Sequence, residues 1–236
     1  MKGLGFLLFI LLTAIGSVQA QTPKDTTFSV FFNGGVSYTH ANDPHINRWL
    51  SKYGYPTEPH IPKSYNFEFS AIPASSRFMF SAKISTIASA ANLTSFNLAG
   101  GVYYALIKSR TFFLFAGLAV GYHKDIITLN GNLPPAYQQL ATEYNKQLSL
   151  RRDGLFLEPL VRAFWFPITL RTVQIGLYGG LGADMDLNSG WKLGYYDNSH
   201  GKYNHFKGLT KPTDQQKASE HGVAYNIGLS VRFSLH

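Results

Sequence analysis

The feature of this chain that most restricts its fold is an alternation of apolar and polar residues that recurs in eight segments. In the clearest segment, residues 223–233, one face carries Val, Tyr, Ile, Leu, Val and Phe, and the other carries Ala, Asn, Gly, Ser and Arg. A period of two residues is that of a β-strand whose two faces meet different surroundings. The other seven segments are residues 28–39, 65–71, 77–84, 96–106, 111–123, 155–165 and 173–185. The pattern predicts an all-β protein.

Two of the eight segments allow a second interpretation. Residues 112–122 form a continuous apolar run that also fits a buried helix, although three Phe, a Val and two Gly favour a strand. In the sixth segment, Glu158 and Arg162 have the spacing of a helical ion pair, but Pro159 between them disfavours a helix interior. Because proline also removes a hydrogen bond from a sheet, we expect a β-bulge at Pro159.

The connections between the segments alternate in length around the whole chain. Short turns at residues 73–76, 107–110 and 167–172 alternate with longer loops at 40–64, 85–95, 124–153 and 187–221. An even number of strands with short turns at one end and long loops at the other is typical of barrels in the bacterial outer membrane. Charged residues are 14% of the chain and aromatic residues 15%, which suits strands between lipid and a barrel interior. We predict an eight-stranded antiparallel up-and-down transmembrane β-barrel over residues 27–236.

The first twenty residues predict export. Lys2 precedes an apolar stretch at residues 4–15, and Val18, Gln19 and Ala20 suit a signal peptidase. The pattern predicts a cleaved signal peptide at residues 1–20, followed by a short lead at 21–26. An uncleaved N-terminal anchor is the alternative.

Cysteine content and charge exclude several classes of function. The chain has no cysteine, which rules out disulfides, thiolate metal sites, cysteine catalysis and a diacyl lipid anchor. Without the signal peptide it has 20 Lys and Arg against 13 Asp and Glu, scattered along the sequence. We expect no nucleic-acid partner for an exported chain with this pattern.

With these segments placed, the chain resembles the small eight-stranded outer-membrane barrels of the OmpA-transmembrane-domain and OmpX type, and the porin-family outer-membrane β-barrel proteins. This resemblance implies location in the outer membrane of a Gram-negative bacterium, with outer-membrane lipids and the barrel-insertion machinery as partners. Such barrels end in an alternating strand that the insertion machinery reads. Residues Tyr225, Ile227, Leu229, Val231 and Phe233 match that insertion signal, although the chain continues with Ser234, Leu235 and His236.

Six charged residues are predicted to face the barrel interior. They are Glu68, Lys83, Glu158, Arg162, Asp184 and Arg232, three of each sign. An eight-stranded barrel is just wide enough for side chains to fill it, so buried charges there must be paired. Two interpretations remain: a luminal charge network that plugs the barrel, and a narrow path for ions.

Histidines collect in the predicted loops. His40, His45, His60, His200, His205 and His221 all belong to the first and last long loops, which become neighbours when the barrel closes. They are candidates for binding a ligand at the loops, such as a metal or haem. Because polar loops also tolerate histidine freely, the prediction includes no metal and no cofactor.

The sequence favours a non-enzymatic protein that acts structurally or through its long extracellular loops. Residues 187–221 mix lysines with aromatic residues, a composition that suits acidic glycans: Lys192, Lys202, Lys207, Lys211, Lys217, Trp191, Tyr195, Tyr196 and Tyr203. The alternatives are a narrow small-solute channel and an accessory barrel of a secretion or transport assembly. A lipid-modifying enzyme at the rim would use His123, Ser199 or His200, which match no catalytic motif. Residues 46–53 have helical spacing, and Trp49 and Tyr53 there also suit the lipid headgroup region.

Overall fold

A single antiparallel sheet dominates the computed structural model, which describes residues 28–40, 48, 50–52, 63–87, 93–129, 148–187, 191–197, 202–205 and 221–235. Its strands are β1 (Phe28–His40), β2 (Lys63–Pro73), β3 (Phe78–Ile87), β4 (Leu93–Lys108), β5 (Phe112–Thr128), β6 (Leu148–Leu170), β7 (Val173–Asp186), β8 (Lys192–Asp197), β9 (Lys202–His205) and β10 (His221–Leu235). Each of the eight alternating segments lies in a strand, except that residues 77 and 111 immediately precede β3 and β5. The strand interpretation of residues 112–122 is confirmed, and the helical one is wrong.

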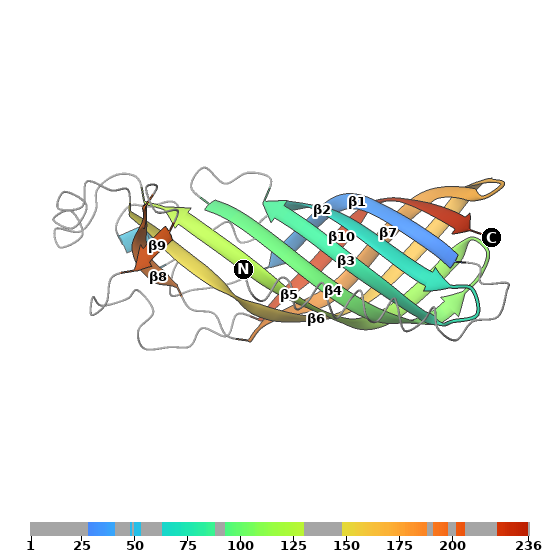
Figure 1. Ribbon diagram of the computed structural model, residues 1–236, viewed down its shortest axis with the longest axis horizontal. Coiled ribbons are helices and arrows are strands. Elements are labelled where there is room, and N and C mark those ends of the chain that lie inside the picture. The colour runs from blue at the N-terminus through green and yellow to red at the C-terminus, as the bar shows by residue number, and fades with distance from the viewer. Residues whose placement is uncertain are drawn as a thin grey trace.

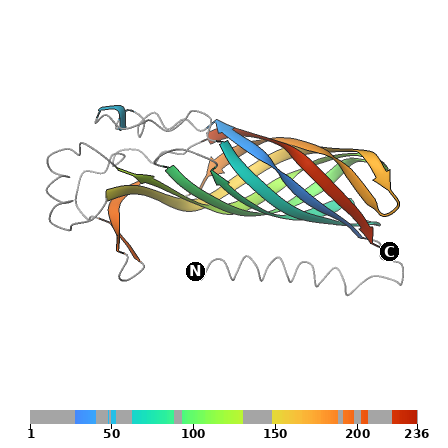
Figure 2. The same ribbon diagram turned by 90° about the horizontal axis from the view of Figure 1, so that it is seen from above.

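Eight of these strands close into a barrel. Their order is β5-β4-β3-β2-β1-β10-β7-β6, and pairing of β5 with β6 joins the two ends. The first strand pairs with the last along its whole length, from Phe28 opposite Leu235 to His40 opposite Val223. Figures 1 and 2 show the strands inclined to the long axis of the barrel. Closure leaves no unpaired strand edge around the barrel, as a sheet in lipid requires. The eight-stranded antiparallel barrel is confirmed.

The barrel has its apolar residues outside and its polar residues inside. Strand β2 shows this clearly: Tyr65, Phe67 and Phe69 are exposed, whereas Asn66 and Glu68 are buried. In water such an outer surface would be unfavourable, because each exposed aromatic side chain forgoes the free energy of burial. The exterior therefore requires an apolar solvent, and the barrel spans a membrane.

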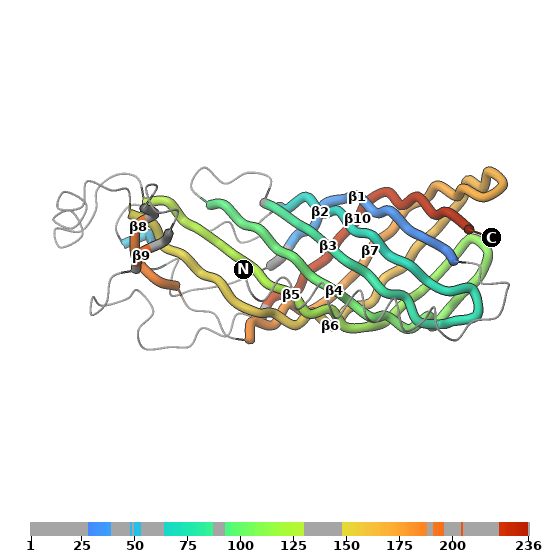
Figure 3. The backbone as a smooth tube through the Cα atoms, viewed as in Figure 1, coloured from blue at the N-terminus to red at the C-terminus, as the bar shows by residue number. Residues whose placement is uncertain are grey.

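The short turns lie together at one end of the barrel (Figure 3). The turns that follow β2, β4 and β6 are at the end where the C-terminus lies, and the hairpin of β8 and β9 is at the other end. This arrangement agrees with the alternation of short turns and longer loops that the sequence predicts. The predicted bounds, however, are too wide at several connections. Residues 63–64, 85–87, 93–95 and 167–170 belong to strands. Residues 124–128 and 148–153 belong to β5 and β6, and residues 192–197 and 202–205 form strands within the predicted last loop.

The predicted β-bulge at Pro159 is wrong. Pro159 pairs opposite Leu118 in an unbroken register between β5 and β6. The register between β6 and β7 is also the same on both sides of Pro159, with Leu157 opposite Met185 and Leu160 opposite Gly182. The shift lies instead between Trp165 and Ile168, close to the turn. There the strand ends within a few residues, so an interrupted ladder removes few hydrogen bonds.

Little helix is present in the described part of the chain. Arg48 and residues 50–52 have a helical backbone, in agreement with the short helix expected at residues 46–53. Trp49, Tyr53 and the predicted signal peptide and lead lie outside the described residues. Among the residues that can be described, no helix is long and apolar enough to cross a membrane.

Candidate functional site

An aromatic layer fills the lumen near the short turns. Phe31, Phe113, Phe115, Phe164 and Phe166 point inward from β1, β5 and β6, and each is at most 1% exposed. Their rings meet at centroid distances of 5.4–6.3 Å in edge-on, tilted and stacked pairs. Packing of this kind leaves no room for a water column, so the layer closes the lumen at this end.

Arg232 lies beside this aromatic layer. Its guanidinium donates to Oε1 of Gln174 at 2.6 Å and to Oγ of Ser29 at 2.9 Å. It also stacks over the ring of Phe113, 4.7 Å from the centroid. Of the six charges predicted to form one luminal network, Arg232 therefore sits apart, held by neutral oxygens and an aromatic face.

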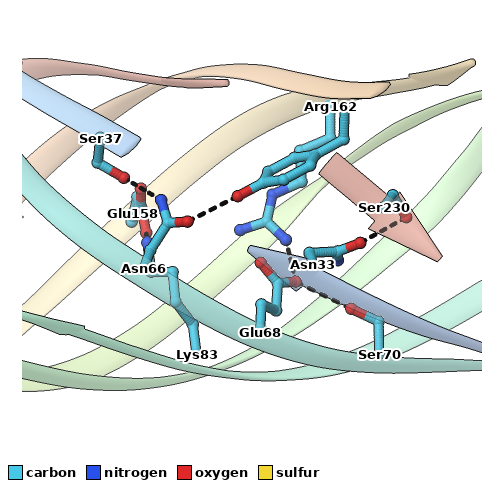
Figure 4. A network of polar contacts seen from close by, with 10 residues as sticks. Asn33, Ser37, Asn66, Glu68, Ser70, Lys83, Glu158, Arg162 and Ser230 are labelled. Atoms are coloured by element: carbon cyan, nitrogen blue, oxygen red, sulfur yellow. Dashed lines mark hydrogen bonds and ion pairs between the residues drawn. The ribbon is translucent and has the colours of Figure 1, made fainter. Parts of the chain in front are cut away.

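A buried ion pair crosses the middle of the lumen. Nη1 of Arg162 contacts Oε1 of Glu68, and the two side chains are 0% and 2% exposed. Oγ of Ser70 donates to the same carboxylate oxygen at 2.9 Å, and the ring of Tyr103 lies 4.7 Å from the guanidinium. Figure 4 shows the guanidinium of Arg162 directed at Glu68 across the barrel. Two residues 94 positions apart in the sequence thus neutralise each other.

A second pair joins Lys83 to Glu158. Their Nζ and Oε2 atoms are 2.5 Å apart, and both side chains are largely buried. Next to this pair, Nδ2 of Asn66 donates to Ser37 (Figure 4). The hydroxyl of Tyr178 donates to Oδ1 of the same Asn66 at 2.6 Å. Four of the six predicted charges are thus brought together as two ion pairs, and a neutral hydrogen-bond chain from Tyr178 through Asn66 to Ser37 lies beside them.

Asp184 faces a small polar chamber between the Lys83–Glu158 pair and the long-loop end. The chamber has a volume of about 30 Å³, and its wall includes Ser37, Ser64, Ser85, Asn97, Asp184 and Asn226. Asp184 makes none of the ion pairs described above.

A second group of charges lies further towards the long-loop end. Nδ1 of His123 is 3.2 Å from Oδ1 of Asp186, and the Arg152 guanidinium is 2.7 Å from Oδ2 of Asp125. Arg152 also stacks over the ring of Trp191 at 4.9 Å. Nε2 of His123 has no hydrogen-bond partner among the described residues, so no serine there forms a nucleophile–base pair with it. Ser199 and His200 lie outside the described residues.

Beyond this group, β5 and β6 continue outward and carry a folded extension. The amide of Leu129 donates to the carbonyl of Leu148 at 3.0 Å, and β8 pairs with the start of β6, with Leu193 opposite Leu150. A small apolar core accompanies these strands. Its members are at most 4% exposed and comprise Ile127, Leu129, Leu148, Leu150, Trp191 and Leu193. We call this part of the chain, β8, β9 and the outer ends of β5 and β6, the outer extension.

No family model matches this chain, and no curated protein matches it. Solved structures do. A major outer membrane protein from Thermus thermophilus is similar with a TM-score of 0.55 at 14% identity, over 89% of this chain and 100% of that one. This is the fold of an outer-membrane β-barrel.

Two further solved structures cover the same share of this outer-membrane barrel and all of their own chains. Neisserial surface protein A has a TM-score of 0.46 at 10% identity. Ail, the attachment invasion locus protein of Yersinia pestis, has a TM-score of 0.42 at 9% identity. With identities this low, the functional site has to be argued from the residues of this chain itself.

The predicted insertion signal lies on the outward face of β10. Tyr225, Ile227 and Leu229 are exposed, at 41%, 61% and 63%, while Asn226 and Ser230 between them are buried. Val231 and Phe233 continue this face towards the C-terminus, and β10 extends to Leu235. The predicted facing of this strand is therefore correct.

The structure describes the predicted histidine cluster only in part. The backbones of His40, His205 and His221 lie at strand ends in β1, β9 and β10. His45, His60 and His200 lie outside the described residues. Within the described residues, no group of three or more His, Asp or Glu side chains has an arrangement that could hold a metal ion.

Sequence reasoning missed several residues of the lumen. Tyr103 and Tyr178 lie within two of the alternating segments, but no pattern in the sequence indicates their contacts with Arg162 and Asn66. Their inward-facing positions in the alternation could have indicated polar contacts in the lumen, because the hydroxyl of a buried tyrosine usually needs a hydrogen-bond partner. Asp125 and Arg152 were placed in a loop, and nothing in the sequence marks them as partners.

Proposed function

We propose that this protein is a non-enzymatic outer-membrane barrel that works as a rigid scaffold and binds an acidic surface polymer through its outer extension. The single observation behind this proposal is the outer extension itself. A barrel that needed only to close would end its strands at the membrane, whereas β5 and β6 continue and acquire two further strands and an apolar core. Building such a structure outside the membrane suits a role at that surface.

The composition of the extension supports an acidic polymer as the ligand. Lys192 is exposed on β8, and Lys202 lies on β9 next to Tyr203. Basic side chains interleaved with aromatic ones bind sulfated or carboxylated sugars by charge and stacking. Trp191, which the sequence also nominated, is only 1% exposed and packs under Arg152, so its role is structural.

The lumen favours this scaffold role over the alternative of a channel. The aromatic layer and the Arg162–Glu68 pair lie one after the other along the barrel, and each consists of fully buried side chains. An ion passing through would have to separate a buried pair, which costs several kcal/mol. We expect no conductance steps from the purified protein in planar bilayers.

The binding role is tested with heparin as the probe. Cells displaying the protein should adhere to heparin-coated beads, and Lys192→Glu together with Lys202→Glu should abolish that adhesion. The matched control is Arg110→Glu, which reverses an exposed basic residue in a short turn at the opposite end of the barrel. Equal loss with Arg110→Glu would mean that net charge, and not the outer extension, governs adhesion. Retention of adhesion in the lysine variant would refute the proposed function.

A further inference from the structure

The polar chamber near the long-loop end has the composition of a cation site. Its wall draws on every barrel strand except β5, and its volume of about 30 Å³ exceeds the 10–15 Å³ that one water molecule needs. It therefore admits an ion with at most one or two water molecules. It lies on the long-loop side of the Lys83–Glu158 pair, whereas the aromatic layer closes the other end of the barrel.

Three oxygen atoms at this chamber lack a hydrogen-bond partner among the described residues. They are Oδ1 of Asn97, Oδ1 of Asp184 and Oδ1 of Asn226, from β4, β7 and β10. Asn226 is only 9% exposed, and a Cβ atom added at Gly180 would lie 2.8 Å from its Oδ1. Buried polar atoms are nearly always satisfied in native proteins, so three acceptors at one small chamber call for a shared donor or cation.

The net charge of the chamber indicates whether these oxygen atoms bind a cation or a neutral hydrogen-bond donor. The ammonium group of Lys83 is 2.5 Å from Glu158, so these two opposite charges cancel. In its ionised form, Asp184 then leaves the chamber one negative charge in excess. Because positions 180 and 182 of β7 are glycines, no side chain at either position stands between the Asp184 carboxylate and the other residues around the chamber.

We propose that this chamber binds one divalent cation of the calcium type, through the Asp184 carboxylate and the amide oxygens of Asn97 and Asn226. Carboxylate and amide oxygens are the ligands that hard cations prefer, and Ca²⁺ accepts irregular sets of six to eight oxygens. The hydroxyl groups of Ser64 and Ser85 in the same wall offer further oxygens. Mg²⁺ fits less well, because it keeps several water molecules that the chamber has no room for. This site is independent of heparin binding at the outer extension.

The test is calorimetric titration of the full chain, refolded in a nonionic detergent and freed of metals with a chelator. Ca²⁺ should bind at one site per chain with a Kd of about 0.1–1 mM, the range of extracellular calcium sites. Titration with KCl at matched ionic strength should produce no saturable heat. Saturable binding of K⁺ with equal affinity would overturn the assignment to a divalent cation.

Two substitutions locate the site. Asp184→Asn keeps the shape of the side chain and should weaken Ca²⁺ binding at least tenfold, and Asn226→Leu should do the same by removing an oxygen. Asp153→Asn is the matched control, because that carboxylate is on β6 at the outer end, paired with Arg151 away from the chamber. Binding that is absent from the wild type, or that survives unchanged in both Asp184→Asn and Asn226→Leu, would overturn the proposal. Folding of each variant is checked by its shift in mobility on unheated gels.

Discussion

Substitution of Arg162 by methionine should destabilise the barrel by far more than substitution of an arginine at its outer end. Arg162 is 0% exposed, and its loss would leave the Glu68 carboxylate, 2% exposed, without its cation. Removing one member of a buried ion pair costs about 3–5 kcal/mol, because the remaining charge is desolvated and uncompensated. Methionine retains the apolar stem that packs beside Gly180, so lost packing contributes little.

The double variant Glu68→Met with Arg162→Met isolates the electrostatic part. With both charges gone, no unpaired charge remains, and a buried pair replaced by apolar side chains is often neutral in stability. We therefore expect the double variant to lie within about 1–2 kcal/mol of the wild type. Arg151→Met is the matched control: Arg151 and Asp153 are 21% and 28% exposed, so this change should cost about 1 kcal/mol or less.

The assay is reversible urea unfolding in lipid vesicles, followed by tryptophan fluorescence. The reasoning would be refuted if Arg162→Met cost no more than Arg151→Met. It would also be refuted if the double variant lost the sum of the two single losses, since the two charges would then act independently.

Three further predictions concern the barrel wall and the N-terminus. Leu229→Arg should cost about 2–4 kcal/mol because Leu229 faces lipid, whereas Leu235→Arg, at the end of the same face, should cost about 1 kcal/mol or less in the same urea assay. Gly228→Ala should destabilise by about 1–3 kcal/mol in that assay, since the new Cβ would lie 2.3 Å from the carbonyl of Gly34; Gly34→Ala, with 3.8 Å to its nearest neighbour, should be tolerated. Mass spectrometry of the membrane-extracted protein should find a mature chain that begins at Gln21, and retention of residues 1–20 would contradict cleavage.

The barrel could be predicted from the sequence because its signal is local and repeated. Each strand carries apolar residues on the side that faces lipid and polar residues on the side that faces the lumen. The sequence of β2 alone therefore shows that Phe67 and Glu68 point in opposite directions. Beyond the membrane this contrast ends. Residues 124–128 and 148–153 carry charges on both faces, a pattern that is typical of a loop. In the structure they are nevertheless strands, and Arg152 on one pairs with Asp125 on the other.

The pairing of side chains inside the lumen was harder to predict from the sequence. Alternation identifies which charges point inward, but the choice of partner depends on the register of strands distant in the chain. Glu68 meets Arg162 because four strands, β2 to β5, bring β6 round the barrel, and no local pattern encodes that. For the same reason, alternation alone predicts that Ser230→Arg is tolerated, because it places residue 230 in a polar lumen. The structure corrects this: Ser230 is 0% exposed and donates to Oδ1 of Asn33 at 2.6 Å, so an arginine has no space there.

The distribution of polar groups along the lumen bears on where this protein can act. Next to the short turns the interior is a packed aromatic layer, and in the middle Arg162 and Glu68 neutralise each other. At the long-loop side, the described interior holds a chamber with three oxygen atoms that lack a hydrogen-bond partner among the described residues. Stability favours satisfied polar groups, so unsatisfied ones persist where another requirement maintains them. Both the chamber and the outer extension lie on the side away from the aromatic layer, and a ligand arriving there need not disturb the pairs that hold the barrel together.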